Sequence, residues 1–327
     1  MTHWKGNIMK RVLKILISTI LILVGVGVFL YPNFREWNTN REVNQIVKQF
    51  EKDFKTDESQ SDKKSETESS DTSESSNGDS TTPTKFTELY QELQDYNKNL
   101  VANGQQLTDA WSYQQAPISL DHMPSKDATI GYIDIPDMKV KLPLLLGASK
   151  EDLSKGAAVL SQTSMPIGGA DTNCVIAAHR GWRGSAYFQR IENMKVGSKV
   201  YVTNPWETLV YEVTSTKVVN PDDVDVIKLQ PGKDMVTLIS CHPYVLGGGP
   251  YRYIVYCERV GTEEKKENVK MENPAIDDSI DESVQIPQDE LDASDKLLYW
   301  EQYLRIGLPV VTILLSILII VVNRRKK

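Results

Sequence analysis

The chain has 327 residues, of which 40% are hydrophobic, and this composition allows one substantial folded core with appendages. Its net charge of −7 is unevenly placed, because residues 51–80 and 261–297 together hold −14. The part between these tracts has no basic excess for nucleic acid, so we expect no nucleic-acid partner and assign the acidity to linkers.

Residues 1–33 are predicted to form a cytoplasmic tail and a transmembrane anchor. Basic residues at positions 5, 10, 11 and 14 precede an uncharged apolar run at residues 15–30. A cleaved signal peptide is the alternative, but the run is long for one and no clear cleavage site follows it. The membrane is therefore an expected partner.

Residues 34–84 are predicted to form a stalk and a tether. Apolar side chains recur at helical spacing in the first part: Val43, Ile46, Val47, Phe50 and Phe54. This spacing predicts a short amphipathic helix over residues 34–54. The acidic, Ser-rich stretch at residues 56–82 is nearly free of apolar residues and is expected to be disordered.

Residues 85–128 are predicted to hold a helix followed by a loop. The apolar residues of the stretch 86–103 fall on one helix face, which we expect to pack on the domain that follows. Gly104 is a natural stop for this helix.

Residues 129–260 alternate short β-rich runs with turns. The runs are 130–135, 140–145, 173–178, 199–202, 208–219, 235–240 and 251–260. Seven or eight such runs with few helices predict a mostly β fold, a closed or nearly closed barrel of about eight strands.

The C-terminal part mirrors the N-terminal part. An acidic linker at residues 261–303 leads to residues 304–327, where an apolar run at 306–322 precedes four basic residues. Because Lys and Arg mark cytoplasmic flanks, both termini are expected in the cytoplasm. The sequence thus predicts two membrane-spanning helices, and it places everything between them outside the cell.

Three reactive side chains each lie where a β-rich run begins or ends. Cys241 closes one run before His242-Pro243, Arg252 opens the next, and His179 follows the run 173–178. A thiol, an imidazole and a guanidinium brought together are typical of a nucleophile, an acid or base, and an oxyanion or substrate clamp.

The segment TLISC ending at Cys241, the segment AAHRGW around His179, and the arginine 11 residues after the cysteine resemble the signature of the sortases. These are cysteine transpeptidases of Gram-positive cell surfaces. The resemblance extends from about residue 129 to 260 and takes in GYIDIP and PIGG, while Ser240 stands where the family usually has threonine. It implies a sortase barrel with Cys241, His179 and Arg252 as catalytic residues and no cofactor.

With an apolar run at each end, the chain resembles the pilus-assembly (class C) sortases. Those enzymes typically carry a lid, an aspartate followed by one residue and an aromatic, which Asp109 and Trp111 match. Ala110 stands in place of the common proline. An ordinary loop is the alternative interpretation of this segment.

The resemblance implies cleavage of an LPXTG-like sorting signal through a Cys241 thioacyl-enzyme, with transfer to an amine. The expected partners are LPXTG-type surface proteins or pilin subunits, and the expected acceptor is a pilin lysine. Three alternatives stay open: a sortase that uses the peptidoglycan precursor as acceptor, a thiol peptidase that hydrolyses its substrate, and a non-enzymatic adhesion or scaffold module.

The remaining polar and sulfur groups receive plainer interpretations. Cys174 and Cys257 are expected to be small buried side chains, although a disulfide between them stays open. His242 is set aside as the base because neighbours on a strand point to opposite faces. The sequence shows no spacing typical of metal ligands. We expect Arg180, Arg183, Asp222 and Asp223 to be solvated.

Overall fold

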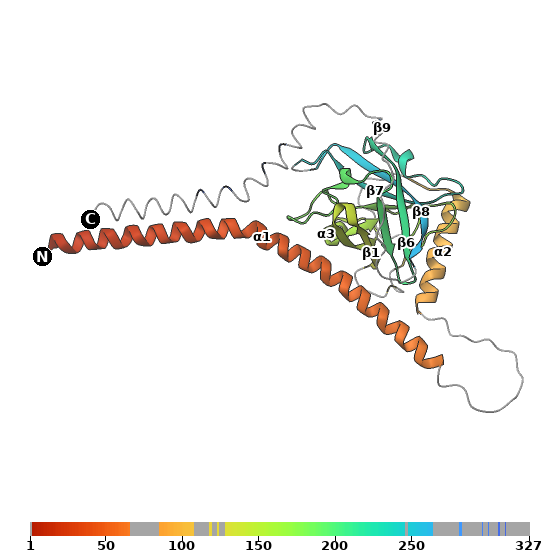
Figure 1. Ribbon diagram of the computed structural model, residues 1–327, viewed down its shortest axis with the longest axis horizontal. Helices are drawn as coiled ribbons and strands as arrows, with labels where there is room; N and C mark the ends of the chain where they lie inside the picture. Colours follow the sequence, from red (N-terminus) through yellow and green to blue (C-terminus); the bar gives the residue numbers. More distant parts are fainter. Residues whose placement is uncertain are drawn as a thin grey trace, which may run out of the picture. The chain divides into compact units, whose positions relative to one another are not determined.

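The computed structural model describes residues 2–65, 85–107, 128–245 and 248–263, with isolated positions elsewhere (Figure 1). Residues 40–182 and 186–286 belong to one compact unit, which holds the barrel and the candidate site. The predicted lid, including Asp109 and Trp111, lies outside the described residues. So does almost all of the apolar run 306–322.

Helix α1 (Thr2–Ser65) includes the predicted stalk and extends well beyond it in both directions. Val43, Val47 and Phe50 are buried, so the stripe expected from their spacing packs inside the compact unit to which these residues belong. The helix continues to Ser65, into the stretch expected to be disordered. Within the residues that the structure describes, no helix is both long enough and apolar enough to cross a bilayer.

Helix α2 (Lys85–Asn103) follows the predicted bounds closely and packs on the barrel as expected. Leu89 and Leu93 are fully buried in the main core. Polar contacts fix the same face, because the Asn97 side chain accepts a hydrogen bond from the backbone of Met165 at 2.7 Å. Gly104, with φ of +77°, ends the helix in the left-handed region that favours glycine.

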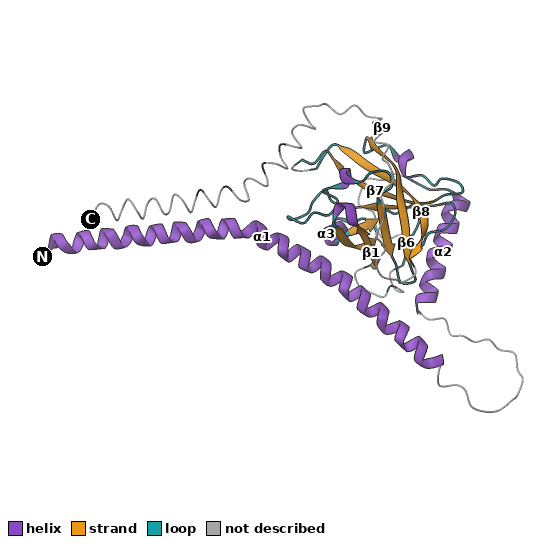
Figure 2. Cartoon of the chain, in the orientation of Figure 1, coloured by secondary structure: helices purple, strands orange, loops and turns teal. Residues whose placement is uncertain are grey.

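The strands form one mixed sheet, drawn in orange in Figure 2, which closes into a barrel. They are β1 (Thr129–Ile135), β2 (Val140–Leu146), β3 (Ala157–Val159), β4 (Thr172–Ala177), β5 (Lys199–Thr203), β6 (Thr208–Val219), β7 (Asp234–His242), β8 (Tyr251–Glu263) and β9 (Asp281–Glu282). Their order is β5-β1-β2-β3-β4-β7-β8-β6-β9, and β5 also pairs with β6. That last pairing closes eight strands, as predicted.

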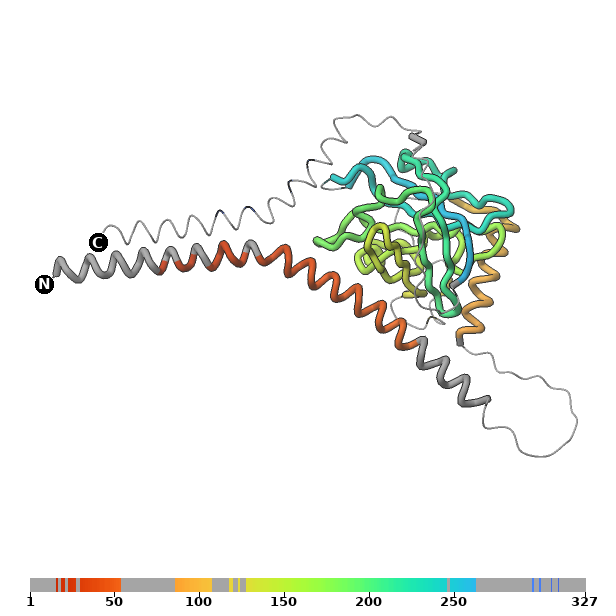
Figure 3. The backbone as a smooth tube through the Cα atoms, viewed as in Figure 1, coloured from red at the N-terminus to blue at the C-terminus, as the bar shows by residue number. Residues whose placement is uncertain are grey.

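Short helices fill the connections between the strands. They are η1 (Pro136–Met138), α3 (Lys150–Lys155), η2 (Ile191–Asn193) and η3 (Val224–Ile227). Figure 3 traces the backbone from residue 128 to residue 245 as one continuous tube. The short strands β3 and β9 were absent from the predicted runs.

Alternation along β4, β7 and β8 divides their side chains between two apolar clusters. We call the face that carries Ile176, Leu238 and Val255 the core face, since these residues belong to the larger cluster. We call the opposite face the site face; it carries Val175, Ala177, Ile239 and Ile254, which belong to a smaller cluster. Because successive residues of a strand point to opposite faces, the face of every neighbouring residue follows from these positions.

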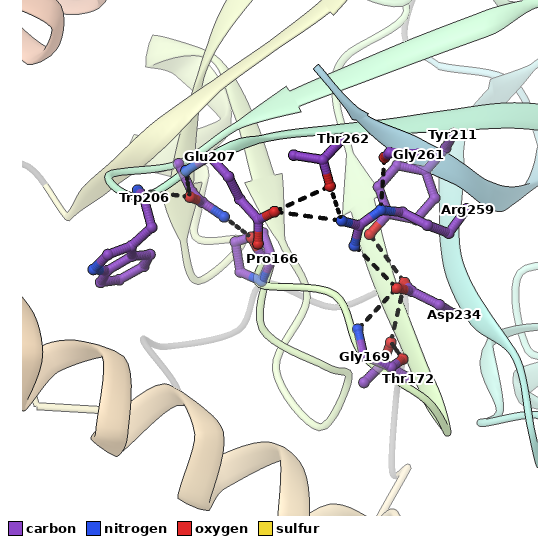
Figure 4. A network of polar contacts seen from close by, with 11 residues as sticks. Pro166, Gly169, Thr172, Trp206, Glu207, Tyr211, Asp234, Arg259, Gly261 and Thr262 are labelled. Atoms are coloured by element: carbon purple, nitrogen blue, oxygen red, sulfur yellow. Dashed lines mark hydrogen bonds and ion pairs between the residues drawn. The ribbon is translucent and has the colours of Figure 1, made fainter. Parts of the chain in front are cut away.

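A polar network joins the first residue of β7 to the end of β8 (Figure 4). The Asp234 carboxylate accepts hydrogen bonds from Arg259 at 3.1 Å, from Tyr211 at 3.1 Å and from the Gly169 backbone at 2.8 Å. Gly168 has φ of +66°, and a Cβ atom built there would lie 2.3 Å from the Arg259 guanidinium. The PIGG turn therefore requires glycine at this position.

Candidate active site

Cys241 and Arg252 are direct partners across the antiparallel pair β7–β8. Side chains at directly opposed positions share a face, with Cβ atoms about 4.5–5.5 Å apart. Two residues before Cys241, Ile239 lies on the site face, and two residues after Arg252, Ile254 lies there too. The thiol and the guanidinium are therefore both on the site face.

His179 follows β4, which runs parallel to β7 with Ala177 opposite Ile239. The backbone of Ala178 continues the ladder, donating to the carbonyl of Ile239 at 3.2 Å. The Ser240 hydroxyl donates to the carbonyl of Ala178 at 2.9 Å and ties the two strand ends together. Serine thus supplies the hydroxyl at the position where the sortases usually have threonine.

The imidazole of His179 is held by the loop that follows it. Trp182 stacks on the ring, with centroids 4.4 Å apart and planes 13° apart. Backbone amides of Gly181 and Phe188 donate to the carbonyl of His179 at 2.9 and 3.0 Å. Burial lowers the pKa of His179 below its usual value, because desolvation disfavours the charged ring. At neutral pH the imidazole is therefore mainly neutral and able to accept a proton.

Arg252 is oriented by the turn that leads into β8. Its Nη1 donates to the carbonyls of Tyr251 at 2.9 Å and Gly249 at 3.3 Å. Gly248 in the same turn has φ of +94°, and a Cβ atom built there would lie 3.9 Å from the Cys241 Sγ. The glycine-rich turn thus passes close to the thiol.

The site face around these groups is apolar. Its buried side chains come from several elements: Ala148, Ala158, Leu160, Val175, Val219, Val226, Ile227, Ile239 and Ile254. Leu107, after helix α2, also packs on this cluster. These side chains are buried, so they pack against one another and hold in place the strand ends that carry the thiol and the guanidinium.

His242 lies on the core face, as alternation from Cys241 requires. It is 4% exposed, and its Nδ1 lies 2.8 Å from a carboxylate oxygen of Glu192. Arg180 belongs to the same cluster, since its Nη2 lies 2.5 Å from the other oxygen of Glu192. The expectation that Arg180 is solvated was wrong: the residue is 7% exposed, because Glu192 supplies a counter-charge beneath the sheet.

The two remaining cysteines are buried and unpaired. Cys174 on β4 and Cys257 on β8 both face Val236 of β7, one on each side. Two strand spacings of about 4.8 Å each separate them, which is beyond the reach of a disulfide. Burial raises the pKa of both thiols, so neither is a competing nucleophile.

The acidic turn after Pro221 contains one exposed carboxylate and one that caps a short helix. Asp222 is exposed, and the Asp223 side chain accepts a hydrogen bond from the Asp225 backbone at the start of η3.

Within the described residues, no group of three or more His, Cys, Asp and Glu side chains is arranged to hold a metal ion.

Comparisons with known proteins all point to one family. The sortase domain matches residues 133–260. Sortase D of Bacillus subtilis is 30% identical over 152 residues, 46% of this chain and 73% of that protein. Sortase A of Staphylococcus aureus is 32% identical over 157 residues, 47% of this chain and 72% of that protein. The solved structure of sortase C1 of GBS pilus island 1 gives a TM-score of 0.50 at 27% identity, covering 57% of this chain and 87% of that one.

A closed barrel with a thiol, an imidazole and a guanidinium at its strand ends is typical of an enzyme that transfers acyl groups through a thiol. The chain belongs to the sortase family and is a sortase cysteine transpeptidase. This membership decides against the scaffold interpretation.

Proposed function

We propose that the chain is a membrane-anchored sortase that joins pilin subunits, with Cys241, His179 and Arg252 as its catalytic residues. The observation that supports these roles most directly is the register: Cys241 is opposite Arg252, and His179 follows the strand paired with β7 on its other side. The likeness to sortase C1 of GBS pilus island 1 supports the pilus class.

In the first step the Cys241 sulfur attacks the carbonyl carbon between Thr and Gly of an LPXTG-like signal. The thiol proton passes to His179, which then donates it to the leaving glycine amine as the C–N bond breaks. Arg252 donates hydrogen bonds to the oxygen that becomes negative. The product is a thioester on Cys241.

In the second step an amine of the acceptor attacks the thioester carbon. His179 takes the proton that the amine loses and passes it to the Cys241 sulfur, which leaves as the thiol while the new amide forms. A pilin lysine is the proposed acceptor. The peptidoglycan precursor is the alternative acceptor.

The test uses the detergent-solubilised full chain, an LPXTG-type peptide, and a choice of a pilin lysine peptide or a peptidoglycan-type amine. Mass spectrometry should find an acyl-enzyme on Cys241 and an amide product with the lysine peptide. Cys241→Ala and His179→Ala should remove both products while the barrel stays folded. Normal acyl-enzyme in either variant would contradict the assigned roles, and water as the only acceptor would favour a hydrolase.

Attachment at both chain ends is part of the proposal and rests on sequence. The uncharged runs at residues 15–30 and 306–322, each with basic residues on its terminal side, support two spans and two cytoplasmic termini. The catalytic barrel would then lie outside the cell, where the surface proteins are.

The lid at Asp109 and Trp111 stays a prediction from sequence. If it covers Cys241, Asp109→Ala and Trp111→Ala should both speed labelling of the thiol by a small reagent. The effect should be modest, because an exposed ion pair from Asp109 to Arg252 is worth only about 0–1 kcal/mol. Equal labelling rates in the wild type and both variants would show that this segment is an ordinary loop and not a lid.

A further inference from the structure

An ionic cluster lies beneath Cys241 on the core face of the sheet, with two buried members and one, Glu192, whose side chain is 40% exposed. Its members are Arg180, Glu192 and His242, and the side chains of Arg180 and His242 are only 4% and 5% exposed. Each oxygen of Glu192 contacts a different partner: one lies 2.5 Å from Arg180 Nη2, and the other lies 2.8 Å from His242 Nδ1. The carboxylate therefore bridges the two cationic or proton-donating groups.

The protonation of the cluster follows from its contacts. Desolvation alone would raise the pKa of Glu192, but the hydrogen bond from His242 and the charge of Arg180 outweigh it and bring the pKa to about 2. Glu192 is thus ionised at neutral pH and only accepts hydrogen bonds. The His242 Nδ1 must then carry the proton, so its 3.1 Å approach to Arg180 Nη1 is a contact and not a hydrogen bond.

Arg180 connects this cluster to the backbone of the nucleophile. Its Nη1 donates to the carbonyl of Cys241 at 3.0 Å, and its Nε donates to the carbonyl of Gln189 at 3.1 Å. In the chain Arg180 directly follows His179. One planar guanidinium therefore fixes the end of β7, the start of the loop after β4, and Glu192 in a single arrangement.

We propose that Arg180 and Glu192, with His242 as their partner, are positioning residues that hold the Cys241 and His179 backbones in register for the transfer reaction. They act from the core face and do not contact the substrate. The proposal rests on the catalytic roles proposed above for Cys241 and His179. A purely stabilising role is the competing explanation, and it predicts that losing one partner destabilises the fold while the folded fraction keeps its kcat.

The test compares Arg180→Lys and Glu192→Gln with Arg190→Met in the full chain. Lysine keeps the charge but lacks the fork, and glutamine keeps the shape of Glu192 but lacks the charge. Arg190 is an exposed arginine in the same loop and serves as the matched control. Each variant is measured for thermal unfolding, for kcat and KM with a sorting-signal peptide, and for the pH profile of Cys241 alkylation by iodoacetamide. Cys174 and Cys257 are buried, so alkylation of the folded protein reports Cys241.

For Arg180→Lys and Glu192→Gln we expect kcat to fall by about 10- to 100-fold with KM little changed, since small displacements of reacting groups carry costs of this size. The alkylation profile should move along the pH axis in both. Arg190→Met should match the wild type. Arg180→Lys should lower kcat even where its unfolding temperature equals that of the wild type.

Two results would overturn the proposal. One is wild-type kcat and an unmoved alkylation profile in folded Arg180→Lys and Glu192→Gln. The other is a loss of kcat in each variant that merely follows its fraction unfolded. If the wild type itself forms no acyl-enzyme, the proposed function fails on that assay, while the alkylation profiles still decide whether the cluster positions the thiol.

Discussion

The position of the Arg252 side chain can be tested directly. Two carbonyls of the preceding turn hold its guanidinium, and the residue is the cross-strand partner of Cys241. We expect Arg252→Lys to lower kcat/KM by about 100-fold, since lysine keeps the charge but loses the rigid planar fork that reaches these carbonyls and the oxyanion at the same time. Steady-state cleavage of a sorting-signal peptide measures the change. Turnover within a few-fold of wild type would mean that the fork is not needed.

The pH dependence should report His179. Its folded pKa lies below the usual 6.5 because of burial, and the neutral ring is the form that accepts the thiol proton. Activity should therefore be retained as pH falls to 6.5 and should be lost only as pH passes through the lower folded pKa. A kcat/KM profile with an acid limb centred below 6.5 is expected. A limb centred above 6.5 would contradict the desolvated environment.

The difference between Cys241 and Arg180 shows what local sequence reveals about single residues. Cys241, His179 and Arg252 stand out because each is a reactive type at the end of a β-rich run. Arg180 looks like any surface arginine, since its partner Glu192 is 12 positions away and His242 is 62 positions away. The one available signal was His242: a polar residue on the core face of a strand needs a buried partner.

At the scale of elements, the alternating pattern located the long strands because each buries one face against the main core. The bounds predicted for β6 match those observed, those for β1 differ by one residue at its start, and those for β4 differ by one residue at each end. Strand β3 was missed because three residues carry too little periodicity, and its pairing with β2 and β4 depends on distant segments. The extent of α1 was also missed, since its polar end has no apolar stripe.

The network around Asp234 gives a prediction at this scale. Asp234→Ala leaves Arg259 and Tyr211 without their shared acceptor, and we expect a loss of about 2–4 kcal/mol in the free energy of unfolding. Urea unfolding measures it, with Asp222→Ala in an exposed turn as the control. Because Asp234 and Cys241 lie near opposite ends of β7, the folded fraction should keep its specific activity. An unchanged unfolding midpoint would show that the network adds no stability.

At the scale of the whole molecule, the proposed topology predicts where a protease can reach. Trypsin added to wall-stripped cells should cut near Lys63 and Lys64, because the proposed anchor places this stretch outside the membrane. Immunoblotting against tags on both termini follows the fragments, and a cytoplasmic protein serves as the control for lysis. Cutting that requires a permeabilised membrane would reverse the proposed orientation.

The division of β4, β7 and β8 into two faces has a consequence for protein engineering. Substitutions on the site face at Val175, Ile239 and Ile254 disturb the smaller apolar cluster, because all three side chains are buried. Substitutions on the core face reach the packing of the barrel and the cluster under the nucleophile. A mutant library for new sorting signals should therefore leave the buried apolar positions of both faces unchanged. Randomising consecutive positions on these strands would mix altered selectivity with unfolded protein.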